Sequence, residues 1–151
     1  MRRKDRCISN DEAFEILKDA KYGVLSMCTS DNKAYGIPIS FVSTDDAIYF
    51  HCAKEGTKLD YLRLNNNVSF CVVGNVETLP SKFGTIYEST IVSGTTREIE
   101  GEEKYNALMN FLRKYSGDYI QEGKSFIDNL SDKVTVVKLS IESITGKARK
   151  Q

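Results

Sequence analysis

Short runs of apolar residues, separated by polar turns, dominate the hydropathy pattern of this chain. They predict strands over residues 22–28, 34–42, 47–52, 68–73, 85–99 and 134–144. The early connections are short, so we expect antiparallel pairing. The run 68–73 is apolar nearly throughout, and we therefore expect that strand to be buried on both faces. Gly94 is a candidate bulge in the longest strand.

Other segments carry helical spacing. A capping box opens the first helix, because Glu12 follows Ser9 by three residues. A short helix is expected over residues 57–64, a longer one over 102–115, and a short helical piece over 125–130. Residues 74–82, which include Pro80, are predicted to form a loop.

This order of elements indicates a mainly β protein. At least six strands in 151 residues predict a closed β-barrel with peripheral helices at its ends. Closure would also remove exposed sheet edges. Without a repeat or a clear linker, residues 1–151 are interpreted as a single domain.

Composition narrows the function classes. Lys plus Arg and Asp plus Glu both total 21, so a net charge of zero argues against general nucleic-acid binding. The four cysteines are widely spaced and there is one histidine, which argues against a structural zinc site. We expect no membrane span and no export signal, and hence a cytoplasmic protein with reduced thiols.

A candidate anion site lies at Gly56, Thr57 and Lys58. These residues follow a strand that ends near His51, and they open the helix expected over 57–64. Free N–H groups and the helix dipole favour a phosphate at such a position. The alternative is that Thr57 caps a surface helix, with Asp60 as a short capping-box partner and a solvated Lys58.

The strand around Gly36 and Pro38 is unusual, because glycine has no side chain to pack and proline donates no ladder hydrogen bond. One interpretation is an edge strand with a bulge. The other is a slot in which the free backbone groups of Ile37, Pro38, Ile39 and Ser40 contact the polar edge of a flat ligand.

His51 is open to three interpretations: a core histidine, a haem or metal ligand, or a neighbour of a cofactor. Strand alternation places Cys52 on the opposite face, so the pair is not interpreted as a Cys-His nucleophile. Tyr87, Glu88 and Ser89 are either rim residues or a ligand-facing surface contributed by a second subunit.

Taken together, these segments resemble a known family over almost the whole chain. The resemblance rests on the blocks Tyr22-Gly23-Val24-Leu25, Tyr35-Gly36-Ile37-Pro38-Ile39-Ser40-Phe41, Tyr49-Phe50-His51-Cys52-Ala53-Lys54-Glu55-Gly56-Thr57-Lys58, Tyr87-Glu88-Ser89 and Ile144-Thr145-Gly146-Lys147-Ala148-Arg149-Lys150. The family that these blocks resemble is the nitroimidazole-resistance branch of the pyridoxamine 5′-phosphate oxidase-like flavoproteins.

The resemblance implies an FMN-binding split barrel with FMN at a homodimer interface. Residues 37–40 would then follow the isoalloxazine ring. Gly56, Thr57 and Lys58 would hold the phosphate, with threonine where many relatives carry histidine. His51 would be the catalytic residue beside the flavin, flanked by Phe50 and Cys52 in the cofactor site. Tyr87 and Ser89 would come from the partner subunit.

The implied function is an oxidoreductase that passes electrons from reduced flavin to a small acceptor such as a nitroaromatic compound. Two alternatives stay open: a non-catalytic flavin-binding or sensing module, and a haem-binding protein with His51 as axial ligand. A vitamin B6 substrate is less supported, because no arginine-histidine pair is placed to bind a second phosphate.

Overall fold

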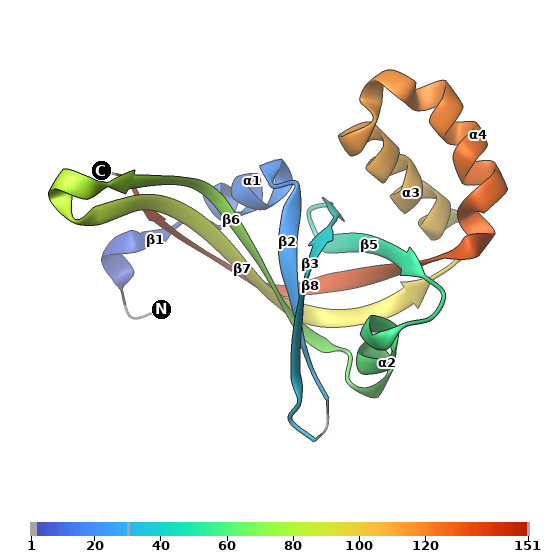
Figure 1. Cartoon of the computed structure of the whole chain (residues 1–151), viewed down its shortest axis with the longest axis horizontal. Helices are drawn as coiled ribbons and strands as arrows, with labels where there is room; N and C mark the ends of the chain where they lie inside the picture. The colour runs from blue at the N-terminus through green and yellow to red at the C-terminus, as the bar shows by residue number, and fades with distance from the viewer. Residues whose placement is uncertain (1–2, 30, 151) are drawn as a thin grey trace.

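One twisted antiparallel sheet with four α-helices forms the computed structural model, which describes residues 3–29 and 31–150 (Figure 1). The strands are β1 (Cys7–Ile8), β2 (Tyr22–Cys28), β3 (Ala34–Ser40), β4 (Val42–Ser43), β5 (Ala47–Ala53), β6 (Asn67–Leu79), β7 (Gly84–Ile99) and β8 (Val134–Arg149). The helices are α1 (Asn10–Asp19), α2 (Thr57–Leu64), α3 (Gly101–Tyr115) and α4 (Ile120–Leu130), and short 3-10 turns occupy Lys4–Arg6, Pro80–Lys82, Gly117–Tyr119 and Ser131–Lys133.

The strand order is β3-β2-β6-β7-β8-β5-β4, with β1 paired to the end of β8. Every pair is antiparallel, as the short connections predict. The sheet is curved but not closed, so the prediction of a closed barrel is wrong. β3 remains an edge strand, which suits Pro38 because proline has no N–H to donate to a second neighbour. The architecture is the split barrel that the resemblance implies.

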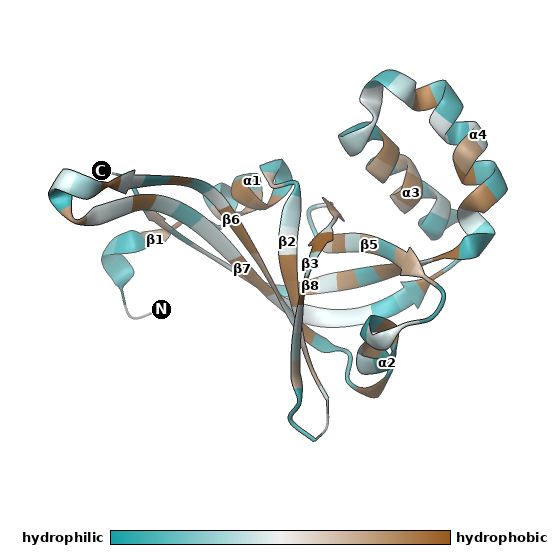
Figure 2. Cartoon of the chain, viewed as in Figure 1, coloured by the Kyte–Doolittle hydropathy of each residue, from teal (hydrophilic) through white to brown (hydrophobic). Residues whose placement is uncertain are grey.

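The inner face of the sheet carries the main core. Leu25, Phe70 and Val92 are wholly buried there and follow one another across β2, β6 and β7. Hydrophobic colours accordingly gather where these strands cross in Figure 2. Helix α1 packs on this face, where the Thr90 hydroxyl donates a 2.9 Å hydrogen bond to the Ala13 carbonyl oxygen. The predicted capping box of Ser9 and Glu12 begins α1.

The outer face is only partly covered. Helix α3 packs on one end of it, where Leu108 and Phe111 join Tyr49, Ile99 and Val136 in a second buried cluster. The remaining outer face is open. Segment 68–73 is therefore buried on one face only, contrary to the prediction, because Ser69, Cys71 and Val73 point outward and Val73 is 60% exposed.

Beyond Val73, β6 and β7 continue together as a long two-stranded arm, residues 74–89, which the sequence did not predict (Figure 1, left). Residues 74–79 were predicted to lie in a loop, yet they extend β6 and pair with β7 beyond a register shift between Val73 and Val76. The shift absorbs Gly74 and Asn75, so these turn-forming residues interrupt the ladder without ending it. The register between β7 and β8 shifts at the predicted position, between Ser93 and Gly94, but the extra residue is Glu142 of β8, so Gly94 itself is not the bulged residue.

Two further boundaries differ from the prediction. Helix α4 begins at Ile120, five residues before the expected helical piece, and β8 continues to Arg149. The end of β8 pairs with the arm through the couples Lys147–Ser89 and Arg149–Tyr87, which lie outside the main core and carry no apolar alternation. Helix α2 and strand β2 have the predicted bounds.

The core assignment predicts a matched difference between two leucines. Leu25→Ala should lower the free energy of unfolding by about 2–5 kcal/mol, because it opens a cavity in a fully buried site. Leu64→Ala, at a position that is 67% exposed, should change it by less than about 0.5 kcal/mol. Urea denaturation at one protein concentration measures both, and equal losses would contradict the assigned core.

Candidate functional site

Two hollows share the same pair of strands: the edge strand β3, and strand β5, which lies next to the last strand β4 at the other end of the sheet. One hollow is lined by Tyr35 and Ile37 from β3 and by Cys52 from β5. The other is lined by Ser40, the last residue of β3, and by His51 of β5. Both candidate binding regions therefore lie at the opening between β3 and β5, where the barrel is split.

The first of these, the anion hollow, has a volume of about 290 Å³ and contains Gly56, Thr57 and Lys58. Gly56 is the N-cap of α2 with a φ of 140°, a backbone conformation that favours glycine, and a methyl group built on it would meet nothing within 4 Å. Thr57 is the first residue of the helix and makes no capping hydrogen bond, so the alternative in which Thr57 caps α2 is wrong. The Leu59 and Asp60 N–H groups donate to the Gly56 carbonyl oxygen, which leaves the N–H groups of Thr57 and Lys58, both lining residues, for a ligand in the hollow.

Lys58 supplies the positive charge of this hollow. Among the described residues, it forms no ion pair within 4.0 Å, unlike Arg63, which pairs with Glu98 at the other end of the same helix. Its charge reaches both strand residues, because it acts to lower the pKa of His51 and opposes the effect of burial on Cys52. Lys58 is thus positioned to attract an anion at the helix N-terminus.

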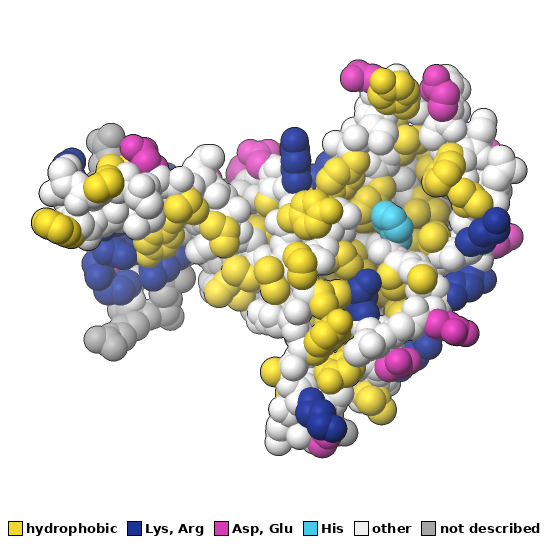
Figure 3. Space-filling view, viewed as in Figure 1, with side chains coloured by type: hydrophobic (Ala, Val, Ile, Leu, Met, Phe, Trp, Pro, Cys, Tyr) yellow, Lys and Arg dark blue, Asp and Glu magenta, His cyan; other side chains and the backbone are white. Residues whose placement is uncertain are grey.

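The second hollow, the apolar cleft, is larger, at about 640 Å³, and lies between the sheet and the α3–α4 hairpin. The histidine is visible in the hollow between these two parts in Figure 3. The cleft is lined by Tyr22, Ser40, His51, Leu108, Phe111, Leu112, Tyr115, Ser116, Tyr119, Glu122, Gly123, Phe126 and Ile127. Its volume falls in the range of about 300–1,000 Å³ that is typical of small-molecule sites.

His51 stands on the outer face with its ring edge-to-face against Phe111, at a centroid separation of 4.7 Å. Phe111 in turn stacks on Tyr115. Partial burial, and secondarily the charge of Lys58, lower the pKa of His51 from its usual value of 6.5. The imidazole is therefore mainly neutral at pH 7 and offers the cleft one N–H donor and one acceptor nitrogen.

The outer face connects β3 to the far end of β7. Direct pairing joins Pro38, Val24, Cys71, Ile91 and Thr145 in one row across five strands. Because residues alternate along each strand, this face also carries Ser40 at one end and the predicted partner-subunit residues 87 and 89 at the other. These outward positions share one continuous surface.

Tyr87 lies on the arm, away from the hollow that contains His51. Arg6 donates a 3.1 Å hydrogen bond from Nη1 to the Tyr87 hydroxyl, and the Lys147 ammonium lies 5.5 Å from the ring centroid. Hydrogen bonding to Lys147 and Arg6 lowers the pKa of the Tyr87 phenol. Within one chain, Tyr87 and Ser89 are therefore not part of either hollow.

The remaining predicted site residues divide by strand face. Ile39 and Phe50 are buried in the inner core, so their side chains do not line either hollow, and a ligand would meet only their backbone. Cys52 points inward from β5, opposite His51 as predicted, and burial raises the pKa of its thiol. Pro38 is exposed on the outer face.

The aromatic side chains of the helical hairpin were not predicted as site residues. Tyr119 and Phe126 line the apolar cleft, although only a short helical piece is expected from the sequence there. Their spacing of seven residues across an amphipathic segment was the available signal, because residues seven apart share a helix face. The predicted helical piece begins only at residue 125, whereas α4 begins at Ile120, so the prediction does not contain this spacing.

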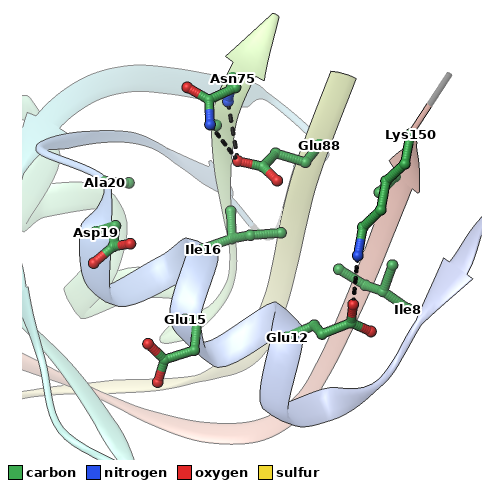
Figure 4. Close-up of a pocket in the computed structure, with 11 residues that line it drawn as sticks. Ile8, Glu12, Glu15, Ile16, Asp19, Ala20, Asn75, Glu88 and Lys150 are labelled. Carbon is green, nitrogen blue, oxygen red and sulfur yellow. Dashed lines mark hydrogen bonds and ion pairs between the residues drawn. The ribbon is translucent and has the colours of Figure 1, made fainter. Parts of the chain in front are cut away.

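A third hollow, of about 350 Å³, lies between α1 and the arm and has the opposite character (Figure 4). Its carboxylates are Glu12, Glu15, Asp19 and Glu88. Lys150 forms a 2.7 Å ion pair with Glu12, and the Asn75 backbone N–H donates a 3.1 Å hydrogen bond to Glu88. This acidic lining does not suit a phosphate.

Metal sites and membrane-spanning helices are two further features to consider in the part of the chain that the structure describes. Across residues 3–29 and 31–150, no group of three or more His, Cys, Asp and Glu side chains is placed to hold a metal ion. None of the helices in this part of the chain is both long enough and apolar enough to span a bilayer.

The sequence matches the family model described as pyridoxamine 5′-phosphate oxidase over residues 9–148. The match includes β3, β5, α2 and the hairpin, which together line both hollows. The chain belongs to this family. Among curated proteins, none matches it.

Solved structures agree on the fold. A candidate 5-nitroimidazole antibiotic resistance protein from Bacteroides thetaiotaomicron is 26% identical, with a TM-score of 0.81 over 94% of this chain and 86% of that chain. A FAD-binding protein from Mesorhizobium loti is 20% identical, with a TM-score of 0.69 over 96% and 98%. A haem storage protein from Vibrio cholerae is 13% identical, with a TM-score of 0.69 over 92% and 94%.

The single histidine provides a direct test of the site electrostatics. We expect His51 to titrate below 6.5, and Lys58→Met to raise its pKa because a repelling positive charge is removed. The histidine ring proton signals in an NMR pH titration measure this without ambiguity. The control Lys54→Met removes a neighbouring charge that does not line the hollow; a shift as large as that of Lys58→Met would contradict the assigned contact.

Proposed function

We propose that this protein is an FMN-dependent oxidoreductase that passes electrons to a small acceptor such as a nitroaromatic compound. One observation carries the proposal: an anion hollow containing Lys58 and an apolar cleft containing His51 lie on the same two strands, β3 and β5. FMN has a phosphate at one end and a flat aromatic ring system at the other. The anion hollow matches the phosphate, the backbone of residues 37–40 matches the polar edge of the ring, and the apolar cleft beside Ser40 would admit the electron acceptor.

The residues present fit the cofactor. The Lys58 ammonium and the N–H groups of Thr57 and Lys58 would hold the phosphate, and the open backbone at Gly56 lets it approach closely. Alternate N–H and C=O groups of an edge strand are unpaired, so residues 37–40 have backbone groups for the polar edge of the ring. The chemistry that FMN supplies when bound is hydride and electron transfer.

The protein's own contribution to the reaction would be binding and orientation. In its neutral form, His51 can donate one hydrogen bond to an electron acceptor bound in the cleft, or accept one from it. A ligand seated against the apolar walls around it would displace water from the cleft. The name of the Bacteroides relative supports a nitroaromatic acceptor, and the Mesorhizobium relative supports a flavin, as activities proposed for this chain.

A homodimer is part of the proposal. The outer face carries apolar side chains that this chain leaves uncovered, with Val73 60% and Ile91 48% exposed. Hydrophobic side chains spread across the middle of the molecule in Figure 3. Contiguous exposed apolar surface of this kind marks an interaction site. A second copy on this face would bring its Tyr87 and Ser89 towards the site formed by residues 37–40.

A haem-binding role is the second candidate. An accessible imidazole in an apolar cleft is what an axial haem ligand requires, and the Vibrio relative is named a haem storage protein. This role leaves Lys58 and the anion hollow without a function. A third candidate is a flavin-binding module that binds FMN without turnover. Steady-state assays with reduced nicotinamides and a panel of acceptors distinguish this module from the enzyme.

Replacing the phosphate-binding lysine should weaken cofactor retention. Lys58→Ala should raise the Kd of FMN about tenfold to a hundredfold, because a hydrogen bond to a charged group contributes about 1.5–3 kcal/mol. Flavin fluorescence titration of apoprotein measures the Kd. Lys54→Ala, outside the hollow, should leave it unchanged. An unchanged Kd in Lys58→Ala would contradict the phosphate assignment.

Charge on the outer face should separate the subunits. Ile91→Glu should raise the dimer dissociation constant more than about tenfold, because an unpaired carboxylate would be buried in the interface. Sedimentation velocity over a range of concentrations measures this effect. Leu64→Glu, on α2 and away from this face, is the control. A wild-type protein that sediments as a monomer would overturn the dimer.

A further inference from the structure

The apolar cleft holds an unexplained feature in its outer wall. Tyr119 and Phe126 turn large aromatic side chains into the cleft while remaining 65% and 66% exposed. The opposite wall is also aromatic, with His51, Phe111 and Tyr115 in successive ring contacts. Two facing aromatic walls leave a space whose natural occupant is another flat ring, because offset and edge-to-face stacking add to area burial.

The charges of the cleft differ from those of the anion hollow. None of the described residues lining it is a lysine or an arginine, and its one carboxylate is Glu122. An anionic ligand would lose hydration there without gaining a positive partner, which is costly. A neutral ring with a hydrogen-bonding group would lose little and could contact His51.

The α3–α4 hairpin is held in place at two residues, Tyr115 and Gly123. The Tyr115 hydroxyl accepts a 3.0 Å hydrogen bond from the Phe41 N–H, and it lies 2.7 Å from the carbonyl oxygens of Lys21 and Phe41. These bonds anchor the end of α3 to the sheet. Helix α4 then packs tightly on α3 at Gly123, where an added methyl carbon would lie 2.1 Å from Leu112 Cδ1.

Gly123 therefore has a packing role. Glycine inside a helix costs about 1 kcal/mol relative to alanine, so its presence within α4 is compensated by the close approach of Leu112. Both Gly123 and Leu112 line the cleft. The distance between the two helices thus sets the position of the aromatic wall formed by Tyr119 and Phe126.

We propose that the α3–α4 hairpin is the specificity wall of the acceptor site, and that Tyr119 and Phe126 restrict the cleft to flat, uncharged aromatic molecules. This inference rests on the proposed flavin-dependent function, because the cleft adjoins the predicted ring-binding edge at Ser40. It names the substrate class of that site and the residues that select it. Phosphorylated and carboxylated acceptors are excluded by the same wall.

Two probes of nearly equal shape test the proposal: neutral 4-nitrobenzamide and anionic 4-nitrobenzoate. Isothermal titration calorimetry of FMN-loaded protein should give a Kd at least about tenfold lower for the amide. Phe126→Ala should weaken amide binding about tenfold through lost ring contact. Phe126→Lys should bring the two Kd values to within about threefold, because it adds a cation to the wall.

Tyr105→Ala is the matched control, since Tyr105 is an exposed aromatic residue of the same hairpin that does not line the cleft. It should leave both Kd values unchanged. Equal binding of the two probes by the wild type, unchanged Kd values in both Phe126 variants, or an equal loss in Tyr105→Ala would each overturn the inference.

The flavin content of every sample, measured from its absorbance after denaturation, separates this inference from the proposed function. A protein that takes up no FMN overturns both. A protein that is saturated with FMN but does not distinguish the two probes overturns the specificity wall alone.

Discussion

The unpaired edge of β3 is the constraint on which the rest of the structure depends. Pro38 removes a donor from this strand, and the sheet continues only on the β2 side. The barrel consequently stays split between β3 and β5, and both hollows of the candidate site lie along these two strands. A closed barrel would pair the same backbone groups and leave none for a ligand.

A second consequence concerns the outer face. A sheet that is apolar on both sides must bury both faces. This chain covers its outer face only with the α3–α4 hairpin. The remainder, from Pro38 across Ile91 to the arm, is exposed in the single chain. The proposed dimer and the proposed cofactor site therefore share one physical origin, since the residues on this surface are continuous with β3.

Local signals in the sequence were sufficient for much of this description. The capping box at Ser9, the bounds of α2 and the opposite faces of His51 and Cys52 depend on neighbours within a few residues, and each is confirmed. The resemblance supplied the family and the split barrel, whereas strand counting alone favoured closure. The predicted contacts of residues 87 and 89 with a cofactor stay predictions, because they need a second chain.

The errors arose where distant contacts override local pattern. A bulge lets β6 continue through Gly74 and Asn75, which are ordinarily turn residues. The polar end of β8 is a strand because the arm pairs with it. The full length of α4 depends on its packing against Leu112 at Gly123, a contact that no short window of sequence contains.

The most direct test of the account is the visible absorption spectrum of the purified protein before and after denaturation, with mass spectrometry of the released compound. The proposed FMN site predicts a flavin spectrum and the mass of FMN. A haem band would instead make His51 an axial ligand and contradict the assignment of the two hollows. A colourless protein that also fails to take up added FMN would contradict the central claim.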